Sequence, residues 1–140
     1  MRYLLDTCVI SELAKRPSNR NVVRWIEGCD EEAVCVSALT IGEIQKGIGK
    51  LAEGARRFSL QHWLDGELKE RFAGRILAVT EEVAQAWGLI QAEAEIRGAP
   101  IPTIDGLIGA TAVAHNLTVV TRNERDMIRT GARVVNPWTA

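Results

Sequence analysis

Short apolar segments alternate along the chain with longer segments whose apolar residues recur every three or four positions. This alternation restricts the fold more than any other feature of the sequence. The short segments are continuous apolar runs, which are typical of strands buried on both faces of a parallel sheet. The expected strands are residues 2–5, 33–36, 76–79, 117–121 and 133–135.

Helices are expected between these strands, where the apolar period of three to four residues appears. Thr40 stands where the N-terminal cap of one helix is expected, and Gly98 follows the last residue of another. The expected helices are residues 10–15, 21–27, 41–51, 53–72, 81–97, 105–115 and 124–129. The pattern predicts the α/β class, with a central, mainly parallel sheet covered by helices on both faces.

The composition limits the class of protein. The chain has 140 residues, and we expect a single domain over residues 1–140. Its 17 Lys and Arg are balanced by 18 Asp and Glu, which excludes a broadly basic coat for nucleic acid but not a localised site. No apolar stretch has the length of a signal peptide or a membrane span, and the three cysteines form no C-x-x-C pair. These features predict a cytoplasmic protein with free thiols and no membrane association.

Four acidic residues lie at or near the ends of the expected strands, where α/β sheets bind their ligands. Asp6 follows the first strand, and Glu43 lies in the first turn of the helix after the second. Asp105 opens the helix that leads into the fourth strand, and Asp126 comes five residues after Thr121, where that strand ends. Clustered carboxylates stay ionised together only beside compensating cations, and oxygen ligands suit Mg²⁺ or Mn²⁺. The pattern therefore indicates metal-assisted hydrolysis of a phosphodiester.

Each acid also has a purely structural interpretation. Thr40 and Glu43 have the spacing of a capping box, in which the glutamate only bonds the helix start. Asp105 has the place of a first-turn acid that complements the helix dipole, and Asp126 that of a surface acid. Asp6 is harder to explain in this way, because a carboxylate beside a buried strand is costly unless it is bonded or coordinated.

Four segments of the chain resemble the sequence motifs of the PIN-domain family. Residues 5–12 read LDTCVISE, residues 36–43 read VSALTIGE, residues 105–112 read DGLIGATA and residues 120–126 read VTRNERD. The corresponding family patterns are L-D-T-N-V-I-S-E, S-x-x-T-x-x-E, D-x-x-I-A-A-T-A and V-T-R-N-x-x-D-F. The ending V-N-P-W at residues 135–138 is also seen in the family. Together the motifs cover nearly the whole chain and most resemble the VapC or FitB type, the toxins of bacterial toxin–antitoxin pairs.

The resemblance implies a PIN-like three-layer α/β/α fold with a five-stranded sheet, and a ribonuclease that depends on Mg²⁺ or Mn²⁺. Asp6, Glu43 and Asp105 match the three acids of the family. The fourth metal-site residue is Asp126 or Asn123, because some relatives carry an Asp at the position of Asn123 and others carry it three residues later.

Other residues near these motifs are candidates for supporting roles. Thr7, Ser37 and Thr121 are candidates for hydroxyls that hold the acids, or else for caps and local backbone bonds. Arg122 and Arg125 are candidates for binding RNA phosphates, or else for a solvated charged face. Two residues depart from the family pattern: Cys8 replaces a common Asn, and Met127 a common Phe.

The resemblance also implies the partners. Toxins of this type form homodimers, and they are held inactive by a small VapB-type antitoxin whose peptide fills a groove near the acids. We therefore expect RNA as the substrate, a cognate antitoxin as the inhibitor, and a homodimer or a dimer of toxin–antitoxin heterodimers.

Three other classes of protein are compatible with parts of this pattern. The first is a non-catalytic PIN-like module that binds RNA or protein, and the second is a DNA nuclease on the same scaffold. The third is a phosphoacceptor signalling domain, which requires an acidic pair after the first strand, where this chain has only Asp6.

Overall fold

Five parallel strands form one central sheet in this computed structural model, which describes residues 1–140. Every neighbouring pair of strands is parallel, in the order β3-β2-β1-β4-β5. The strands are β1 Tyr3–Leu5, β2 Val34–Ser37, β3 Ile76–Leu77, β4 Thr118–Val120 and β5 Arg133–Val135. The expected α/β fold with five strands is confirmed, and the sheet is wholly rather than mainly parallel.

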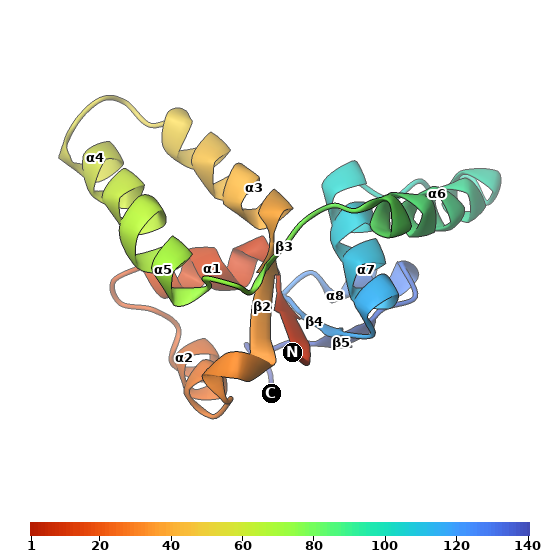
Figure 1. Cartoon of the computed structure of the whole chain (residues 1–140), viewed down its shortest axis with the longest axis horizontal. Coiled ribbons are helices and arrows are strands. Elements are labelled where there is room, and N and C mark those ends of the chain that lie inside the picture. Colours follow the sequence, from red (N-terminus) through yellow and green to blue (C-terminus); the bar gives the residue numbers. More distant parts are fainter.

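Helices fill the segments between the strands (Figure 1). They are α1 Thr7–Ala14, α2 Arg20–Glu27, α3 Ala38–Gly49, α4 Ala55–His62, α5 Lys69–Arg71, α6 Glu81–Ile96, α7 Thr103–His115 and α8 Glu124–Arg129, with a 3₁₀ turn η1 at Glu31–Ala33. The helix expected over residues 53–72 is present as α4 and α5, joined without a break by a π-helical segment, η2, at Trp63–Leu68.

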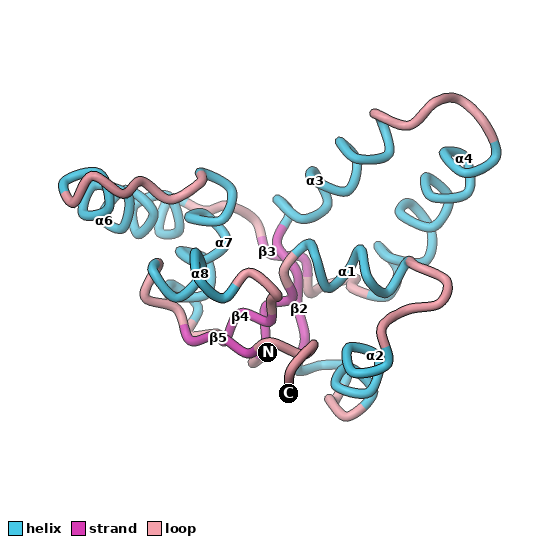
Figure 2. The backbone as a smooth tube through the Cα atoms, turned by 180° about the vertical axis from the view of Figure 1, so that it is seen from behind, coloured by secondary structure: helices cyan, strands magenta, loops and turns pink.

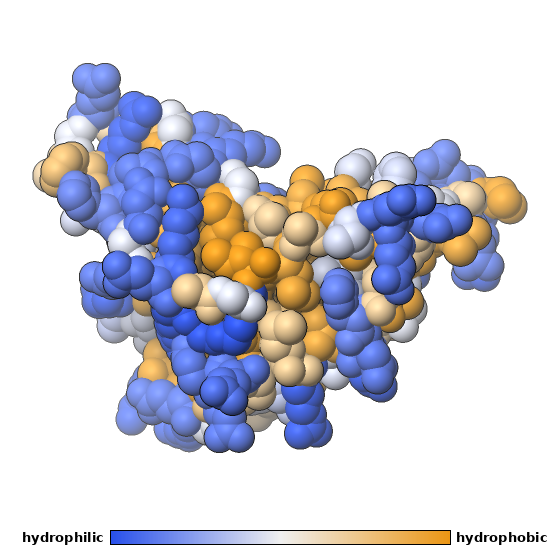
Figure 3. Space-filling model, in the orientation of Figure 1, coloured by the Kyte–Doolittle hydropathy of each residue, from blue (hydrophilic) through white to orange (hydrophobic).

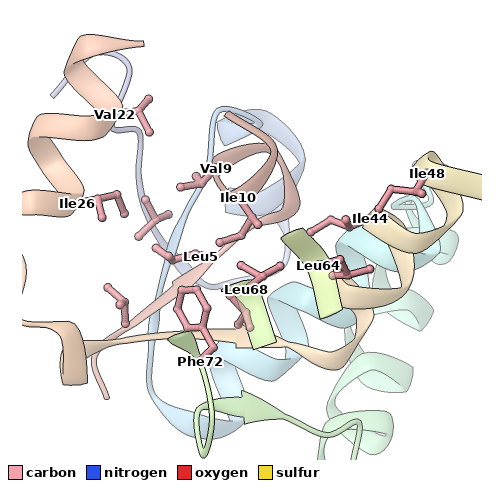
Figure 4. Close-up of a cluster of buried hydrophobic side chains, with 13 residues drawn as sticks. Leu5, Val9, Ile10, Val22, Ile26, Ile44, Ile48, Leu64, Leu68 and Phe72 are labelled. Atoms are coloured by element: carbon pink, nitrogen blue, oxygen red, sulfur yellow. The ribbon is translucent and has the colours of Figure 1, made fainter. Parts of the chain in front are cut away.

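Two hydrophobic cores lie on opposite faces of the sheet, because successive strand residues point to opposite sides. Leu5, Val36 and Val120 belong to the larger core, whereas their neighbours Leu4, Cys35 and Val119 belong to the smaller one. The larger core includes residues of α1, α2, α3 and η2 together with Phe72 (Figure 4). The smaller core is formed with α7 and α8, and α6 packs on α7. The molecule therefore has three layers, with the sheet in the middle.

The strand order places a topological switch point beside β1. The chain moves outward from β1 through β2 to β3, and then returns across the sheet to β4 and β5 on the other side of β1. Ligands of open α/β sheets bind at such reversals, outside the carboxyl ends of the strands. The residue that follows β1 is Asp6. Figure 2, which views the backbone from behind, shows α1 starting from this end of the sheet.

Four helices begin earlier than the sequence pattern suggested, α2 by one residue and three others by two or more. α1 begins at Thr7 rather than residue 10, and α7 begins at Thr103 rather than Asp105. α3 begins at Ala38, because the Ser37 hydroxyl oxygen accepts the Leu39 N–H at 3.0 Å and caps the helix. The capping box expected at residues 40–43 is therefore wrong, since Thr40 already lies inside the helix.

Two arms rise from the sheet, one formed by α3 and α4 and the other by α6 and α7 (Figure 1). In the same orientation, apolar atoms gather over the middle of the molecule, between the mostly polar arm of α3 and α4 and the arm of α6 (Figure 3). No helix combines the length and the apolar character needed to span a bilayer.

Candidate active site

An open pocket of about 400 Å³ lies at the switch point, where β1 ends. Its lining comes from four segments of the chain: the start of α1, α3, α7, and the loop between β4 and α8. The lining residues are Asp6, Thr7, Cys8, Glu43, Asp105, Arg122 and Asn123. The structure thus brings three of the four predicted acids into one pocket with a single cationic side chain.

Asp6 is the most buried of these acids, with 5% of its surface exposed. Its Oδ1 accepts the Thr7 N–H at 2.8 Å, so the side chain also caps α1. Its Oδ2 accepts the Thr121 hydroxyl at 2.7 Å. Burial nevertheless raises the pKa of Asp6 above the usual aspartate value, although both hydrogen bonds act in the opposite direction. The orientation of the carboxylate is therefore fixed, and the two hydrogen bonds only partly offset the cost of burying its charge.

Glu43 points from the first half of α3 toward the start of α1. The Thr7 hydroxyl donates to Glu43 Oε1 at 2.5 Å and lies 3.2 Å from the Thr40 hydroxyl oxygen. Thr40 is fully buried and its place in this network was missed in the sequence, where the motif suggested a helix cap. The sequence spacing could have indicated this contact, because Thr40 lies one helical turn before Glu43 and so shares its face of α3.

Asp105 lies in the first turn of α7, beside Asn123. The Asn123 amide donates to Asp105 Oδ2 at 3.3 Å and approaches Asp126 Oδ2 at 3.5 Å. Asp126 does not line the pocket, and its Oδ1 forms an ion pair with Arg129 at 3.3 Å. The structure thus places Asn123 at the pocket and Asp126 behind it, and the choice between them as the fourth site residue stays a prediction.

The supporting residues divide into two groups. Thr7 and Thr121 bond the acids directly, whereas Ser37 caps α3 and lies outside the pocket lining. Cys8 lines the pocket, with Sγ 3.5 Å from the Thr121 hydroxyl oxygen and 3.9 Å from Asp6 Oδ2. Burial, followed by the charge of Asp6, raises the pKa of the Cys8 thiol. The backbone N–H of Arg122 donates to this sulfur at 3.4 Å.

Negative charge accumulates in the pocket, where Asp6, Glu43 and Asp105 form no salt bridge. The pKa of Asp105 is raised to about 6, first by burial and then by the charges of Asp6, Asp126 and Glu43. Each of these acids therefore lies close enough to Asp105 to disfavour its ionisation. A cation in the pocket would remove this penalty, because an opposite charge favours the ionised form.

The residues of the pocket fit a hydrated divalent cation. The carboxylates offer oxygen ligands, which Mg²⁺ and Mn²⁺ prefer. No group of three His, Cys, Asp or Glu side chains is arranged to hold a metal ion by itself. Mg²⁺ does not need such a cage, since it commonly keeps several waters and binds through one or two carboxylates and a substrate phosphate.

A second, larger groove of about 910 Å³ continues from the pocket between α1, α3 and α4. It shares Thr7 and Glu43 with the pocket, so the two hollows are contiguous. Its walls combine apolar side chains such as Leu60 and Trp63 with cations such as Arg56. The groove therefore suits an extended ligand that carries both apolar and acidic groups.

The sequence matches the family model of the PIN domain over residues 3–132. It is 37% identical over 135 residues to the VapC ribonuclease Y4jK of Sinorhizobium fredii, an alignment that covers 96% of each protein. It is 38% identical over 135 residues to the toxin FitB of Neisseria gonorrhoeae, with 96% of this chain and 97% of the relative covered.

Solved structures show the same likeness. The crystal structure of FitAcB from Neisseria gonorrhoeae contains a chain that matches with a TM-score of 0.92 at 38% identity, and the match covers 99% of both chains. A structure of FitAB bound to a DNA fragment matches with a TM-score of 0.90 at 37% identity, over 97% of this chain and 95% of the other. VapBC2 from Rickettsia felis, at 23% identity over 97% of this chain and 98% of the other, shares the fold with a TM-score of 0.81.

Proposed function

The chain belongs to the PIN-domain family, among its VapC- and FitB-type toxins, and we propose that it is a Mg²⁺- or Mn²⁺-dependent endoribonuclease that cleaves RNA phosphodiester bonds. The observation that carries this proposal is the pocket in which Asp6, Glu43 and Asp105 meet beside one cation. Three adjacent carboxylates are poorly suited to binding RNA phosphates directly, since like charges repel. They are well suited to binding the metal that makes such an approach favourable.

Asp6 and Asp105 would hold the metal, and Glu43 would bind one of its waters. When bound, the divalent cation supplies a water of lowered pKa and neutralises charge that develops on the phosphate oxygens. The protein supplies orientation: Thr121 fixes Asp6, Thr7 fixes Glu43, and Asn123 bonds Asp105. No protein nucleophile is needed for this chemistry.

The test is cleavage of RNA by Asp6→Asn and Asp105→Asn, with Asp30→Asn as the matched control. Asp30 is exposed and makes no side-chain cap bond, so its variant removes the same charge outside the pocket. Both pocket variants are expected to lose Mg²⁺-dependent cleavage while they remain folded, and the control is expected to keep it. If both pocket variants cut RNA as fast as the parent, the metal-site proposal is wrong.

Two further measurements separate the competing classes. Calorimetric titration with Mg²⁺ or Mn²⁺ distinguishes a catalytic domain from a non-catalytic PIN-like module, which should bind neither ion. Matched RNA and DNA strands of the same sequence distinguish a ribonuclease from a DNA nuclease. We expect cation binding in the parent, its loss in Asp105→Asn, and cleavage of RNA only.

We also propose that a VapB-type antitoxin inhibits the chain by placing a peptide in the groove beside the pocket. The groove reaches the acids through Thr7 and Glu43, so a bound peptide arrives at the metal site. An antitoxin arginine among the carboxylates would supply the positive charge that the metal otherwise provides. The relative at 38% identity is named toxin FitB, and the solved structures FitAcB and FitAB contain matching chains at 38% and 37% identity, which supports this assignment.

Assembly and location complete the proposal. We propose that the chain forms a homodimer, either alone or as two toxin–antitoxin heterodimers, and light scattering of the purified protein tests this. We further propose a single domain in the cytoplasm, where the three free thiols would stay reduced.

A further inference from the structure

Arg122 is the only cation that lines the acidic pocket, yet it forms no salt bridge with the pocket's acids. Its guanidinium carbon lies 5.2 Å from the centre of the Trp138 ring. A guanidinium over the face of an indole is attracted by the ring quadrupole. This contact therefore competes with the pull of the carboxylates on the same group.

The Trp138 ring packs against the core, and the backbone of Trp138 is held by two hydrogen bonds. Its side chain packs against the larger core, although it is only partly buried. The backbone N–H of Trp138 donates to Asn136 Oδ1 at 2.9 Å, and the backbone carbonyl oxygen of Trp138 accepts the Asn21 side-chain amide N–H at 2.9 Å. The contact with Asn21 ties the segment after β5 to the start of α2, and the packing against the core restrains the ring that this segment carries.

The backbone of Arg122 is fixed as well, from the side of the pocket. Its N–H donates to Cys8 Sγ, while the preceding Thr121 hydroxyl donates to Asp6 and accepts the Asn123 N–H at 2.9 Å. Only the exposed side chain of Arg122 is then free to move. The position of its guanidinium depends on the Trp138 ring that its face contacts and on the nearby charge of Glu12, whose pKa the Arg122 charge helps to lower.

We propose that Trp138 is a positioning residue, which holds the Arg122 guanidinium at the edge of the acidic pocket so that it binds the RNA phosphate beside the metal. This inference rests on the proposed function, since it assumes an RNA phosphate at that place. Stacking leaves the edge of the guanidinium, with its N–H groups, free to donate to phosphate oxygens. It also keeps the guanidinium from occupying the carboxylates that bind the metal.

The test is the binding of a labelled RNA 12-mer, at a fixed concentration of Ca²⁺ in place of Mg²⁺ and over a range of salt concentrations, by Arg122→Gln, Trp138→Leu and Trp138→Phe. For single-stranded RNA, the loss of one phosphate contact makes the slope of log K against log salt concentration less negative by about 0.7. We expect Arg122→Gln to weaken binding about tenfold with that change in slope. We expect Trp138→Leu to weaken it about three- to fivefold, and Trp138→Phe to restore most of the loss.

Two controls separate positioning from a merely structural role of Trp138. Arg24→Gln removes one exposed charge on α2, away from the pocket lining, and should leave the affinity nearly unchanged. Trp138→Leu should have no further effect in the Arg122→Gln background, because its action passes through the arginine. The inference is overturned if Trp138→Leu binds RNA like the parent, or if it weakens binding equally in both backgrounds.

The same measurements keep this inference apart from the proposed function. If the parent binds the RNA but does not cleave it with Mg²⁺ or Mn²⁺, the proposed function fails, while coupling between Arg122 and Trp138 still supports the positioning role. If the parent cleaves RNA and the two residues show no coupling, the inference fails alone.

Discussion

At the scale of single residues, the pocket is defined by how its acids are bonded rather than by their number. Asp6 is held by a backbone N–H and by the Thr121 hydroxyl, Glu43 by the Thr7 hydroxyl, and Asp105 by the Asn123 amide. Partners that orient a metal ligand typically change metal affinity or activity by about 10–100-fold when they are removed. The hydroxyls therefore matter nearly as much as the carboxylates.

Thr121→Val tests this role while it keeps the shape of the side chain. Removing the hydroxyl leaves Asp6 Oδ2 without its 2.7 Å donor and the Asn123 N–H without its acceptor. We expect Mn²⁺ affinity to fall about 10–100-fold in calorimetry. The matched control is Thr111→Val, which removes an equally buried hydroxyl that bonds only Leu107 O within α7. Equal affinities in both variants would contradict the role of Thr121.

The raised pKa of Asp105 predicts how stability depends on pH. A carboxyl whose pKa is higher in the folded than in the unfolded protein stabilises the fold at low pH, and this contribution is lost as pH rises through the folded value. For Asp105 that value is about 6, against an ordinary value near 4. Without metal, we therefore expect the parent to lose stability relative to Asp105→Asn between pH 4 and pH 7.

Thermal unfolding of the parent and Asp105→Asn at several pH values in EDTA measures this difference, with Asp30→Asn as the control. A divalent cation prefers the ionised carboxyl, so Mn²⁺ should restore stability near pH 7 and have little effect below pH 5. Parallel pH profiles for parent and Asp105→Asn would contradict the raised pKa of Asp105, which burial and then the neighbouring acids cause.

The sequence predicted the members of the pocket better than the bonds among them. Asp6, Glu43 and Asp105 follow from the rule that the ends of parallel strands share one edge of the sheet. Asp126 lies behind Asn123 because the asparagine stands just before α8, whereas Asp126 is nearly one turn further along the helix. Spacing alone does not show which of the two reaches the pocket, since that depends on how α8 packs against α7.

At the scale of elements, the role of Ser37 follows from its position as the N-terminal cap of α3. Its hydroxyl caps the helix that carries Glu43, and it does not line the pocket. Ser37→Ala should therefore lower the free energy of unfolding by about 1 kcal/mol, whereas Ser37→Thr, which keeps a capping hydroxyl at this buried position, should lose less. RNA cleavage per folded molecule should stay unchanged in both. A large loss of cleavage in Ser37→Ala at full folding would instead place Ser37 in the site.

The π-helical segment shows what an apolar pattern leaves undetermined. Leu60, Leu64, Leu68 and Phe72 recur at intervals of four residues, and each such step turns about 40° too far in an ideal α-helix. A π turn has more residues per turn and offsets part of this drift. Leu64 and Leu68 lie in that turn and are both buried. The apolar pattern predicted the helix correctly. It did not predict the π turn, because a drift of this size is also compatible with a continuous α-helix.

At the scale of the whole molecule, the strand order places the proposed sites of substrate and inhibitor next to each other. The chain reverses direction across β1, so α1 and α3 on one side meet α7 and the loop after β4 on the other. The acids lie at this junction, and the groove between α1, α3 and α4 opens onto it. A ligand that fills the groove reaches the acids without any movement of the sheet.

Filling the groove should therefore weaken inhibition by the antitoxin. Gly47 lies on α3 in the groove wall, and a Cβ built there meets no atom within 4 Å. Gly47→Gln adds a side chain to the groove and also favours the helix, by about 0.5–1 kcal/mol for replacing a mid-helix glycine. We expect more antitoxin to be needed for half inhibition of RNA cleavage, relative to each variant's own uninhibited rate.

Gly49→Gln is the matched control, because Gly49 lies on the same helix, is equally free of close neighbours and does not line the groove. It should be inhibited like the parent, and calorimetry with the purified antitoxin should give the same order of affinities. Since both changes keep the net charge, a difference between them reports the shape of the groove alone. Equal inhibition of Gly47→Gln, Gly49→Gln and parent would mean that the antitoxin reaches the acids by another face of the molecule.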